Sequence, residues 1–278
     1  MTGDWPTAAR WLAGASDDPR ALVVAGVPLA AHAVTPSRYD LAPAAVRARL
    51  GRLSTWHGGR AVELAEVPVR DVGDGDRPPP LDAPLTVLLG GHNAVTYHAL
   101  AGAGGDLARW GLLTLDAHHD VRPYAAGAVG NGSPVRALVD AGLPAAHVVQ
   151  VGITGFSNAG AHRRWCEERG VTVLGPDRLG QVPALLDALA GRCDHVYVDV
   201  DLDVLDRAFA PGCPGSRPGG AAPAQVFDAA LAAGAHPAVR AVDVVELDPT
   251  ADVASVTADA AALTLLNVAA GYALRRRP

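Results

Sequence analysis

The sequence has few cysteines, few aromatic residues and no excess of basic charge, and each shortage argues against a class of protein. Its three cysteines, Cys166, Cys193 and Cys213, are widely spaced and form no Cys-x-x-Cys pair, which argues against a disulfide framework and a thiolate zinc site. The formal net charge of −6 argues against a nucleic-acid surface. The one basic run, residues 275–277, is expected to be a solvated tail.

Long apolar runs are also missing. No stretch reaches the ~20 apolar residues of a membrane span, and residues 1–10 lack the basic and apolar segments of a signal peptide. The sequence therefore predicts a soluble, cytoplasmic protein with no nucleic-acid partner and no membrane partner. Because 49% of its 278 residues are hydrophobic and only 5% are aromatic, its core is expected to consist mainly of Ala, Val and Leu.

What the sequence does contain is an alternation of apolar strands with helices. It predicts a mostly parallel central sheet between two layers of helices, a three-layer α/β/α sandwich, and no linker divides residues 1–278 into more than one domain. An edge strand is expected at 61–70 and a surface loop at 71–84. The other expected strands are 21–27, 85–90, 111–116, 147–153, 171–174, 195–201 and 239–247. The expected helices are 44–50, 94–110, 134–141, 158–169, 182–190, 224–233 and 255–274.

Two acidic clusters follow predicted strands, Asp116-Ala117-His118-His119-Asp120 and Asp199-Val200-Asp201-Leu202-Asp203. Residues two apart in an extended chain point to the same side, so three side chains of each cluster can converge. Like charges packed this densely at buried strand ends would protonate or destabilise the fold unless a cation neutralised them. Carboxylates with a single imidazole suit hard or borderline divalent ions, so we expect Mn²⁺ ahead of Mg²⁺, Ni²⁺ or Zn²⁺.

The predicted sheet also places these clusters together. In open α/β sheets, ligands bind beyond the C-terminal ends of the strands. Four polar segments are predicted there, at residues 90–93, 116–120, 199–203 and 243–246, which favours one shared site. A loop rich in Pro and Gly, residues 211–220, leaves from the same edge and could frame the entrance or be a plain surface loop.

Three ordered motifs, residues 115–120, 201–212 and 243–249, resemble the ureohydrolase family of arginases, agmatinases and formimidoylglutamases. The resemblance extends from about Val23 to the last helix, and the chain is most similar to the formimidoylglutamase branch. It implies an arginase-like fold with two Mn²⁺ ions that activate a hydroxide to attack an amidine or guanidine carbon. It also implies roles: Asp116 and Asp201 bridge the metals, Asp120 binds the first metal, His118 and Asp203 bind the second, and Glu246 holds the cationic substrate group.

The chain departs from the family pattern at the first metal. Where the family has Gly-Gly-Asp-His or Gly-Gly-Gly-His, this chain has Gly-Gly-His92-Asn93, so Asn93 replaces a histidine ligand. An amide oxygen can coordinate a hard ion more weakly, so two ions are expected and one is the alternative. His92 is one residue out of register, and could be a ligand or a residue that packs beside the ligands. Asp199 could be an extra ligand, an acceptor for His118 or a compensation for Asn93.

The second departure concerns the substrate. Arginases and agmatinases have a histidine where this chain has Asn131, before Gly132-Ser133-Pro134, and Asn131 cannot shuttle a proton. Formimidoylglutamases tend to lack that histidine and to have an arginine after the first acidic motif, here Arg122. Arg122 could grip a substrate carboxylate or form a salt bridge with a neighbouring carboxylate. Arg122, Asn131, Ser133 and Glu246 are the expected substrate-binding residues.

The resemblance therefore implies hydrolysis of N-formimidoyl-L-glutamate to L-glutamate and formamide, a step of histidine breakdown. The first alternative is an agmatinase-like or other guanidino-acid hydrolase that releases urea. The second is a degenerate single-metal or non-catalytic homologue that binds a small ligand. A small amidine or guanidine is the expected partner. Homo-oligomers are usual in the family, although no interface is evident in the sequence.

Overall fold

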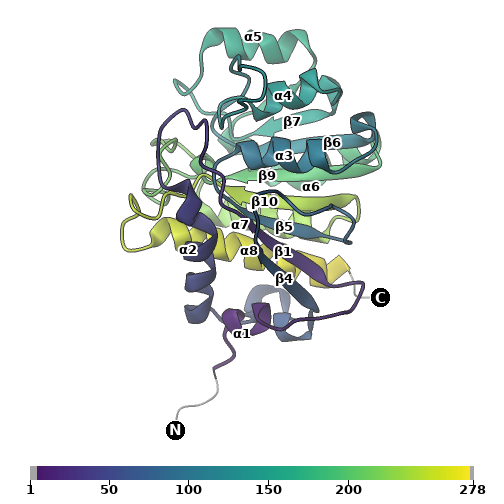
Figure 1. Ribbon diagram of the computed structural model, residues 1–278, viewed down its shortest axis with the longest axis vertical. Coiled ribbons are helices and arrows are strands. Elements are labelled where there is room, and N and C mark those ends of the chain that lie inside the picture. Colours follow the sequence, from purple (N-terminus) through teal and green to yellow (C-terminus); the bar gives the residue numbers. More distant parts are fainter. Residues whose placement is uncertain (1–4, 276–278) are drawn as a thin grey trace.

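The computed structural model describes residues 5–275 and contains an eight-stranded sheet in which every neighbouring pair is parallel (Figure 1). The strand order is β4-β1-β5-β10-β9-β6-β7-β8. The strands are β1 Leu22–Val27, β4 Val69–Asp74, β5 Thr86–Gly90, β6 Trp110–Leu115, β7 Val148–Val151, β8 Thr172–Leu174, β9 His195–Asp201 and β10 Val239–Val245. The four central strands are almost entirely buried, as expected for parallel strands covered on both faces.

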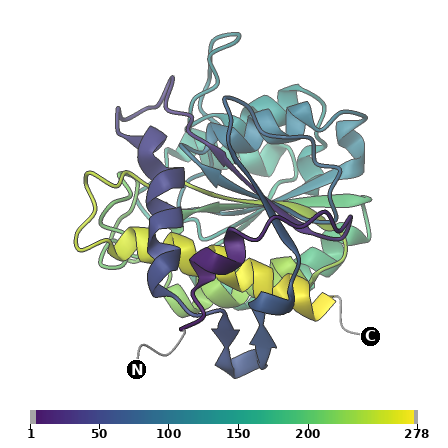
Figure 2. The ribbon, with the colours of Figure 1, turned by 60° about the horizontal axis from the view of Figure 1, so that its bottom comes forward.

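Helices cover both faces of the sheet and confirm the three-layer prediction. Successive strand residues point to opposite faces, so Val196, Val198 and Val200 join one core while Tyr197 joins the other. One layer contains α3 Ala94–Gly102, α4 Pro134–Asp140 and α5 Gly160–Glu168. The other contains α1 Ala8–Leu12, α2 Ala42–Arg49, α6 Val182–Ala190, α7 Pro223–Ala235 and α8 Val256–Arg275. Figure 2 shows α8 crossing beside α2, with the small β2–β3 hairpin (Trp56–His57 and Val62–Glu63) beyond them.

The long helix α8 is a core helix. By length and composition it could cross a membrane, but 72% of its most apolar stretch is buried inside the fold. It packs closely on α7 through two glycines, because a Cβ at Gly271 would lie 2.0 Å from the Leu231 oxygen and one at Gly234 would lie 2.0 Å from the Val268 oxygen. The two helix backbones can approach this closely only where neither carries a side chain.

Some predicted boundaries were wrong. The helix expected over 94–110 ends at Gly102, and the chain then passes Gly104 and Gly105, whose positive φ angles do not continue a helix. The edge strand expected over 61–70 is instead two elements, β3 in the hairpin and β4, which extends to Asp74 into the expected loop.

The basic run 275–277 was expected to be a solvated tail, and this prediction was wrong for Arg275. Arg275 is half-buried and donates hydrogen bonds to the carbonyl oxygens of Gly234, Val239 and Pro84. Residues 276 and 277 lie outside the described residues.

The α7–α8 contact can be tested by replacing Gly271 with Ala. The added methyl group would overlap the backbone of α7, so we expect a loss of roughly 1–3 kcal/mol in the free energy of unfolding, measured by urea denaturation. Gly102→Ala is the control, because it ends α3 with nothing within 4 Å of its Cβ position and should be neutral or slightly stabilising. Equal effects of the two substitutions would contradict the close contact.

Candidate metal centre

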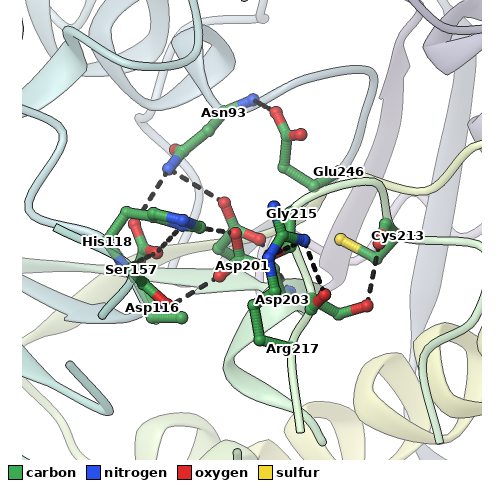
Figure 3. A network of polar contacts seen from close by, with 12 residues as sticks. Asn93, Asp116, His118, Ser157, Asp201, Asp203, Cys213, Gly215, Arg217 and Glu246 are labelled. Carbon is green, nitrogen blue, oxygen red and sulfur yellow. Dashed lines mark hydrogen bonds and ion pairs between the residues drawn. The ribbon is translucent and has the colours of Figure 1, made fainter. Parts of the chain in front are cut away.

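The C-terminal ends of β5, β6, β9 and β10 meet at one edge of the sheet, and the loops that follow them bring the predicted residues together (Figure 3). Asn93 follows β5, Asp116 follows β6, Asp201 ends β9, and Glu246 follows β10. Each of these four side chains is at most 3% exposed. The polar segments that the sequence placed at this edge therefore form one buried cluster.

Two overlapping groups within the described residues have the geometry to hold a cation. Asp116, His118 and Asp203 each offer one ligand atom within 4.8 Å of the others, and so do Asp116, Asp120 and Asp201. Asp116 belongs to both groups, which agrees with the bridging role implied for it, whereas Asp201 belongs to one. The cluster therefore offers two adjacent positions that share one carboxylate.

Backbone donors hold these carboxylates in place. The backbone N–H of His118 donates to Asp116 Oδ1 over 2.6 Å, and that of Ala117 donates to Asp203 Oδ1 over 3.0 Å. The backbone N–H of Asp203 donates to Asp201 Oδ1 over 2.8 Å. His118 Nδ1 lies 2.7 Å from Asp203 Oδ2, so the loops after β6 and β9 are joined by two contacts.

The protein itself supplies the cluster with too little positive charge for its carboxylates. Burial and the nearby charge of Asp203 raise the pKa of Asp116 to about 7, and burial with neighbouring carboxylates raises the pKa values of Asp120 and Asp201 well above the ordinary range. Burial would lower the pKa of His118, but Asp203 and Asp116 outweigh it and raise that pKa to about 12. Carboxyl groups that retain protons for want of a counter-charge fit a site for divalent cations.

Asn93 lies against this cluster with its amide group. Its Nδ2 is 2.7 Å from Asp120 Oδ2, 3.2 Å from Asp201 Oδ2 and 3.4 Å from Asp116 Oδ2. The amide thus stands beside all three carboxylates of the second group, at the position where the family pattern has a histidine. Its Oδ1 faces away from them and lies 3.0 Å from the Thr96 hydroxyl.

Glu246 lies across the cluster from His118 and is held by two donors. Its Oε1 accepts the backbone N–H of Asn93 over 2.8 Å, and its Oε2 accepts from Asn131 Nδ2 over 3.1 Å. Burial raises its pKa to about 7 although these hydrogen bonds lower it. Asn131 Oδ1 in turn accepts the Val34 N–H over 2.8 Å, so Asn131 joins Glu246 to the loop after β1.

Two of the predicted residues point elsewhere. His92 donates from Nε2 to the Ala31 oxygen over 2.7 Å and accepts at Nδ1 from Ala94 N over 3.2 Å, so both ring nitrogens fasten loops and neither faces the carboxylates. Asp199 lies deeper in the sheet beside Asp243, its register partner on β10. Asp199 Oδ1 and Asp243 Oδ1 have no hydrogen-bond partner among the other described groups, and a proton shared between the two carboxyls would satisfy both.

A cavity of about 130 Å³ opens onto the cluster. Its walls include His118, Asp120, Glu246 and Arg122, and an adjoining hollow of about 310 Å³ shares Arg122 and reaches His162. Arg122 forms no ion pair with another described residue. A larger hollow of about 480 Å³ beside α1 has no acidic side chain in its walls, so size alone does not identify the site.

The Pro/Gly loop frames this cavity, since Pro214, Gly215 and Arg217 form part of its wall. Cys213 in that loop is fully buried, and burial raises the pKa of its thiol well above the ordinary value, so it is a poor nucleophile. Ser133, expected to bind substrate, is buried just before α4 and is not among the cavity's lining residues.

Two residues of the site have strained backbones. Asp120 has φ +53° and Glu246 has φ +73°, both in the left-handed region that favours glycine. Such strain persists where the surrounding structure fixes the residue, and it clusters at functional sites. Here it aims both carboxylates into the same cavity.

Four further residues at or beneath the cavity were not predicted to belong to the site. Arg217 lines the cavity from the Pro/Gly loop and Tyr39 lines it from the start of a short 3-10 helix, and Thr96 and Tyr197 contact Asp243 beneath it. Tyr197 lies two positions before Asp199 on the predicted strand, so the period of two places both side chains on the same face. Thr96 lies three residues after Asn93, one helical turn away, which was the available indication of their contact.

The sheet topology and the carboxylate cluster define a protein of the three-layer α/β class with a candidate site for divalent cations. Residues 80–271 match the model of the arginase family, and the chain belongs to that family. It is 31% identical to a formimidoylglutamase of Halalkalibacterium halodurans over 90% of this chain and 86% of that protein.

Solved structures agree. The crystal structure of formimidoylglutamase from Bacillus subtilis is similar with a TM-score of 0.85 and 28% identity, over 95% of this chain and 90% of that one. The fold also matches a formiminoglutamase of Trypanosoma cruzi solved with Mn²⁺, with a TM-score of 0.84 and 22% identity, over 99% of this chain and 100% of that one.

The raised carboxyl pKa values predict how the metal-free chain responds to pH. Asp116 and Glu246 retain protons up to about pH 7, whereas unfolded carboxyls release them near pH 4, so the folded state binds more protons between these values. Stability in a chelator should therefore fall as the pH rises from 5 to 8, and the raised His118 pKa acts in the same direction. Thermal unfolding would show this.

Mn²⁺ should remove much of that fall, because a cation takes the place of the displaced protons. Asp116→Asn, which lacks one titrating group, should show a shallower fall without metal. A chelated wild-type chain that becomes more stable from pH 5 to pH 8 would contradict the proposed protonation of the cluster.

Proposed function

We propose that this chain uses two Mn²⁺ ions to hydrolyse N-formimidoyl-L-glutamate to L-glutamate and formamide, as a single arginase-like domain over residues 1–278. The observation that carries the proposal is one cavity whose walls contain three carboxylates of the cluster, Asp120, Asp201 and Asp203, together with Glu246 and Arg122. These three features match a nucleophile source, an amidine and a substrate carboxylate respectively. The named activity of the bacterial relatives supports the same substrate.

The donor set supports one division of the residues between the two ions. Asp116, Asp120 and Asp201 would hold one ion, joined by Asn93 once its amide turns Oδ1 toward them, and Asp116, His118 and Asp203 would hold the other. Oxygen-rich ligands with one imidazole suit Mn²⁺. When bound, two such ions supply activation of a water and neutralisation of the charge that develops in hydrolysis.

Glu246 positions the reacting group. Each of its carboxylate oxygens accepts one protein donor and keeps lone pairs free for the two N–H groups of an amidinium. A planar amidinium and a carboxylate form paired, charge-assisted hydrogen bonds. Since Glu246 and the carboxylate cluster line one cavity, this pairing would hold the formimidoyl carbon close to the cluster.

Arg122 supports an acidic substrate. This exposed residue lines both cavities and has no carboxylate partner among the described residues. A substrate carboxylate would supply that partner in a bidentate pair, whereas the cationic amine tail of an agmatine-like substrate would be repelled. A cationic residue at this place therefore favours the formimidoylglutamase activity over release of urea from a guanidine.

The reaction balances without a further reactant. The oxygen of water bonds to the formimidoyl carbon, and the bond from that carbon to the glutamate nitrogen breaks. The glutamate nitrogen takes the electron pair of that bond and both protons of the water, which gives glutamate with its ammonium group, and the other amidinium nitrogen stays on the carbon as the NH₂ of formamide. Asn131 cannot supply that proton, since its amide only links Val34 to Glu246.

We further propose a cytoplasmic location and a homo-oligomer. The cytoplasm is consistent with the three cysteines, all of which are reduced and buried in the fold. The oligomer is proposed from the resemblance to the family alone.

Metal removal is the direct test of the metal assignment. Dialysis against a chelator should abolish hydrolysis, and Mn²⁺ should restore it with two ions retained per chain. Asp203→Ala should lower the count, since Asp203 belongs to only one of the two groups. A wild-type chain that retains no Mn²⁺ and hydrolyses no amidine would leave the non-catalytic alternative in place.

Arg122→Ala tests the substrate assignment. Losing a charge-assisted pair should reduce kcat/KM for N-formimidoyl-L-glutamate by roughly ten- to hundred-fold, while an uncharged N-formimidoyl amine should be little affected. Arg136→Ala is the matched control, because Arg136 lies over the Trp165 ring and is not part of the cavity wall. Equal losses on the acidic and uncharged substrates would refute a carboxylate-binding role.

A further inference from the structure

A buried chain of hydrogen bonds runs from the Asn93 amide into the sheet, away from the carboxylate cluster. The Thr96 hydroxyl lies 3.0 Å from Asn93 Oδ1 and 2.7 Å from Asp243 Oδ2. The Tyr197 hydroxyl lies 2.8 Å from the same Asp243 oxygen. All four side chains are at most 1% exposed, so they must largely satisfy one another.

Thr96 has one hydroxyl proton but two acceptors within reach. The carboxylate oxygen of Asp243 is the closer and stronger acceptor, and it can accept whether or not a proton resides on the other oxygen of that group. When the proton points to Asp243, the Thr96 oxygen can only accept. The Thr96 oxygen then needs a donor from Asn93, and only the amide NH₂ group can donate, because Oδ1 is an acceptor.

The Asn93 NH₂ group can therefore donate either to the carboxylates or to Thr96, depending on how the amide is turned. In the structure the NH₂ group donates to Asp120 over 2.7 Å. Its two amide protons face three carboxylates there, and a neutral amide supplies none of the positive charge that they require. A cation among the carboxylates would replace this donor, and the amide could then turn over.

We infer that Thr96 and Asp243 are positioning residues that turn the Asn93 amide oxygen toward the cation held by Asp116, Asp120 and Asp201. In that orientation the Asn93 NH₂ group donates to Thr96 and the Thr96 hydroxyl donates to Asp243, so each of these groups has a partner. The inference rests on the proposed metal site. In this way a neutral amide can act as a metal ligand at the position where the family pattern has a histidine.

The test measures Mn²⁺ affinity, site by site, by equilibrium dialysis of the full chain. Thr96→Val keeps the shape of the side chain and removes the hydroxyl, so one of the two ions should bind about ten- to hundred-fold more weakly while the other is unchanged. In an Asn93→Ala background the same substitution should cause no further loss, because the group that Thr96 orients is gone.

Two variants control for packing. Thr96→Ser keeps the hydroxyl and should retain most of the wild-type affinity. Thr86→Val makes the same chemical change at a buried hydroxyl on β5 that has no hydrogen-bond partner among the described residues, and it should leave both affinities unchanged. Thermal unfolding in a chelator, compared between Thr96→Val and Thr86→Val, separates loss of folding from loss of metal binding.

Each result decides the inference. If Thr96→Val binds Mn²⁺ like the wild type, or weakens it equally with and without the Asn93 amide, Thr96 does not act through that amide. If the wild-type chain retains two ions, the proposed function stands whichever of these results is obtained for Thr96→Val. A wild-type chain that binds no Mn²⁺ would overturn the proposed function, and this inference with it.

Discussion

The burial of like-charged carboxylates at one edge of a parallel sheet is the constraint on which the rest of the site depends. Parallel strands bring their C-terminal ends to the same edge, and helices on both faces exclude water from it. Asp116, Asp120, Asp201, Asp203 and Glu246 are each at most 8% exposed there. The fold therefore both concentrates negative charge and removes the solvent that would screen it, so that positive charge must come from His118, from protons or from a cation.

The loops around the cluster are fixed by hydrogen bonds from backbone to side chain. Asn93 N holds Glu246, Ala117 N holds Asp203, and His92 fastens its own loop to Ala31. Residues that face a reacting group must keep their geometry before the ligand arrives. In this chain the functional side chains are held by neighbouring loops, and the left-handed backbones of Asp120 and Glu246 show that this hold is strong enough to offset local strain.

The sequence was most informative where periodicity and strand ends determine position. Alternating apolar segments predicted the layers, and the acidic clusters lie at the strand ends where parallel topology gathers them. It was less informative where a single side chain's direction depends on distant packing. His92 lies in a predicted loop, yet its ring binds the Ala31 oxygen, and Ser133 is not among the residues that line the cavity. Arg217 lines the cavity from the Pro/Gly loop, which the sequence left as either a frame for the entrance or a plain surface loop.

Some predicted boundaries of helices and strands were wrong because they also depend on features that the hydrophobic pattern does not show. The helix after Asn93 ends at Gly102 because positive-φ glycines follow, and residues 62–63 pair within a hairpin that alternation alone could not distinguish from an edge strand. Thr96 gave no sign of its contact with Asp243, since a threonine in an apolar helix is ordinary until the facing strand is known.

Arg275 has a practical consequence for how the protein can be handled. Its guanidinium binds carbonyls of Gly234, Val239 and Pro84, which lie before or at the N-terminal ends of β10 and β5. The last described helix thus ends at the edge of the sheet opposite the carboxylate cluster. A protein attached to a sensor surface through that end would present its cavity to the solution, with the full height of the sheet between the attachment point and the ligand.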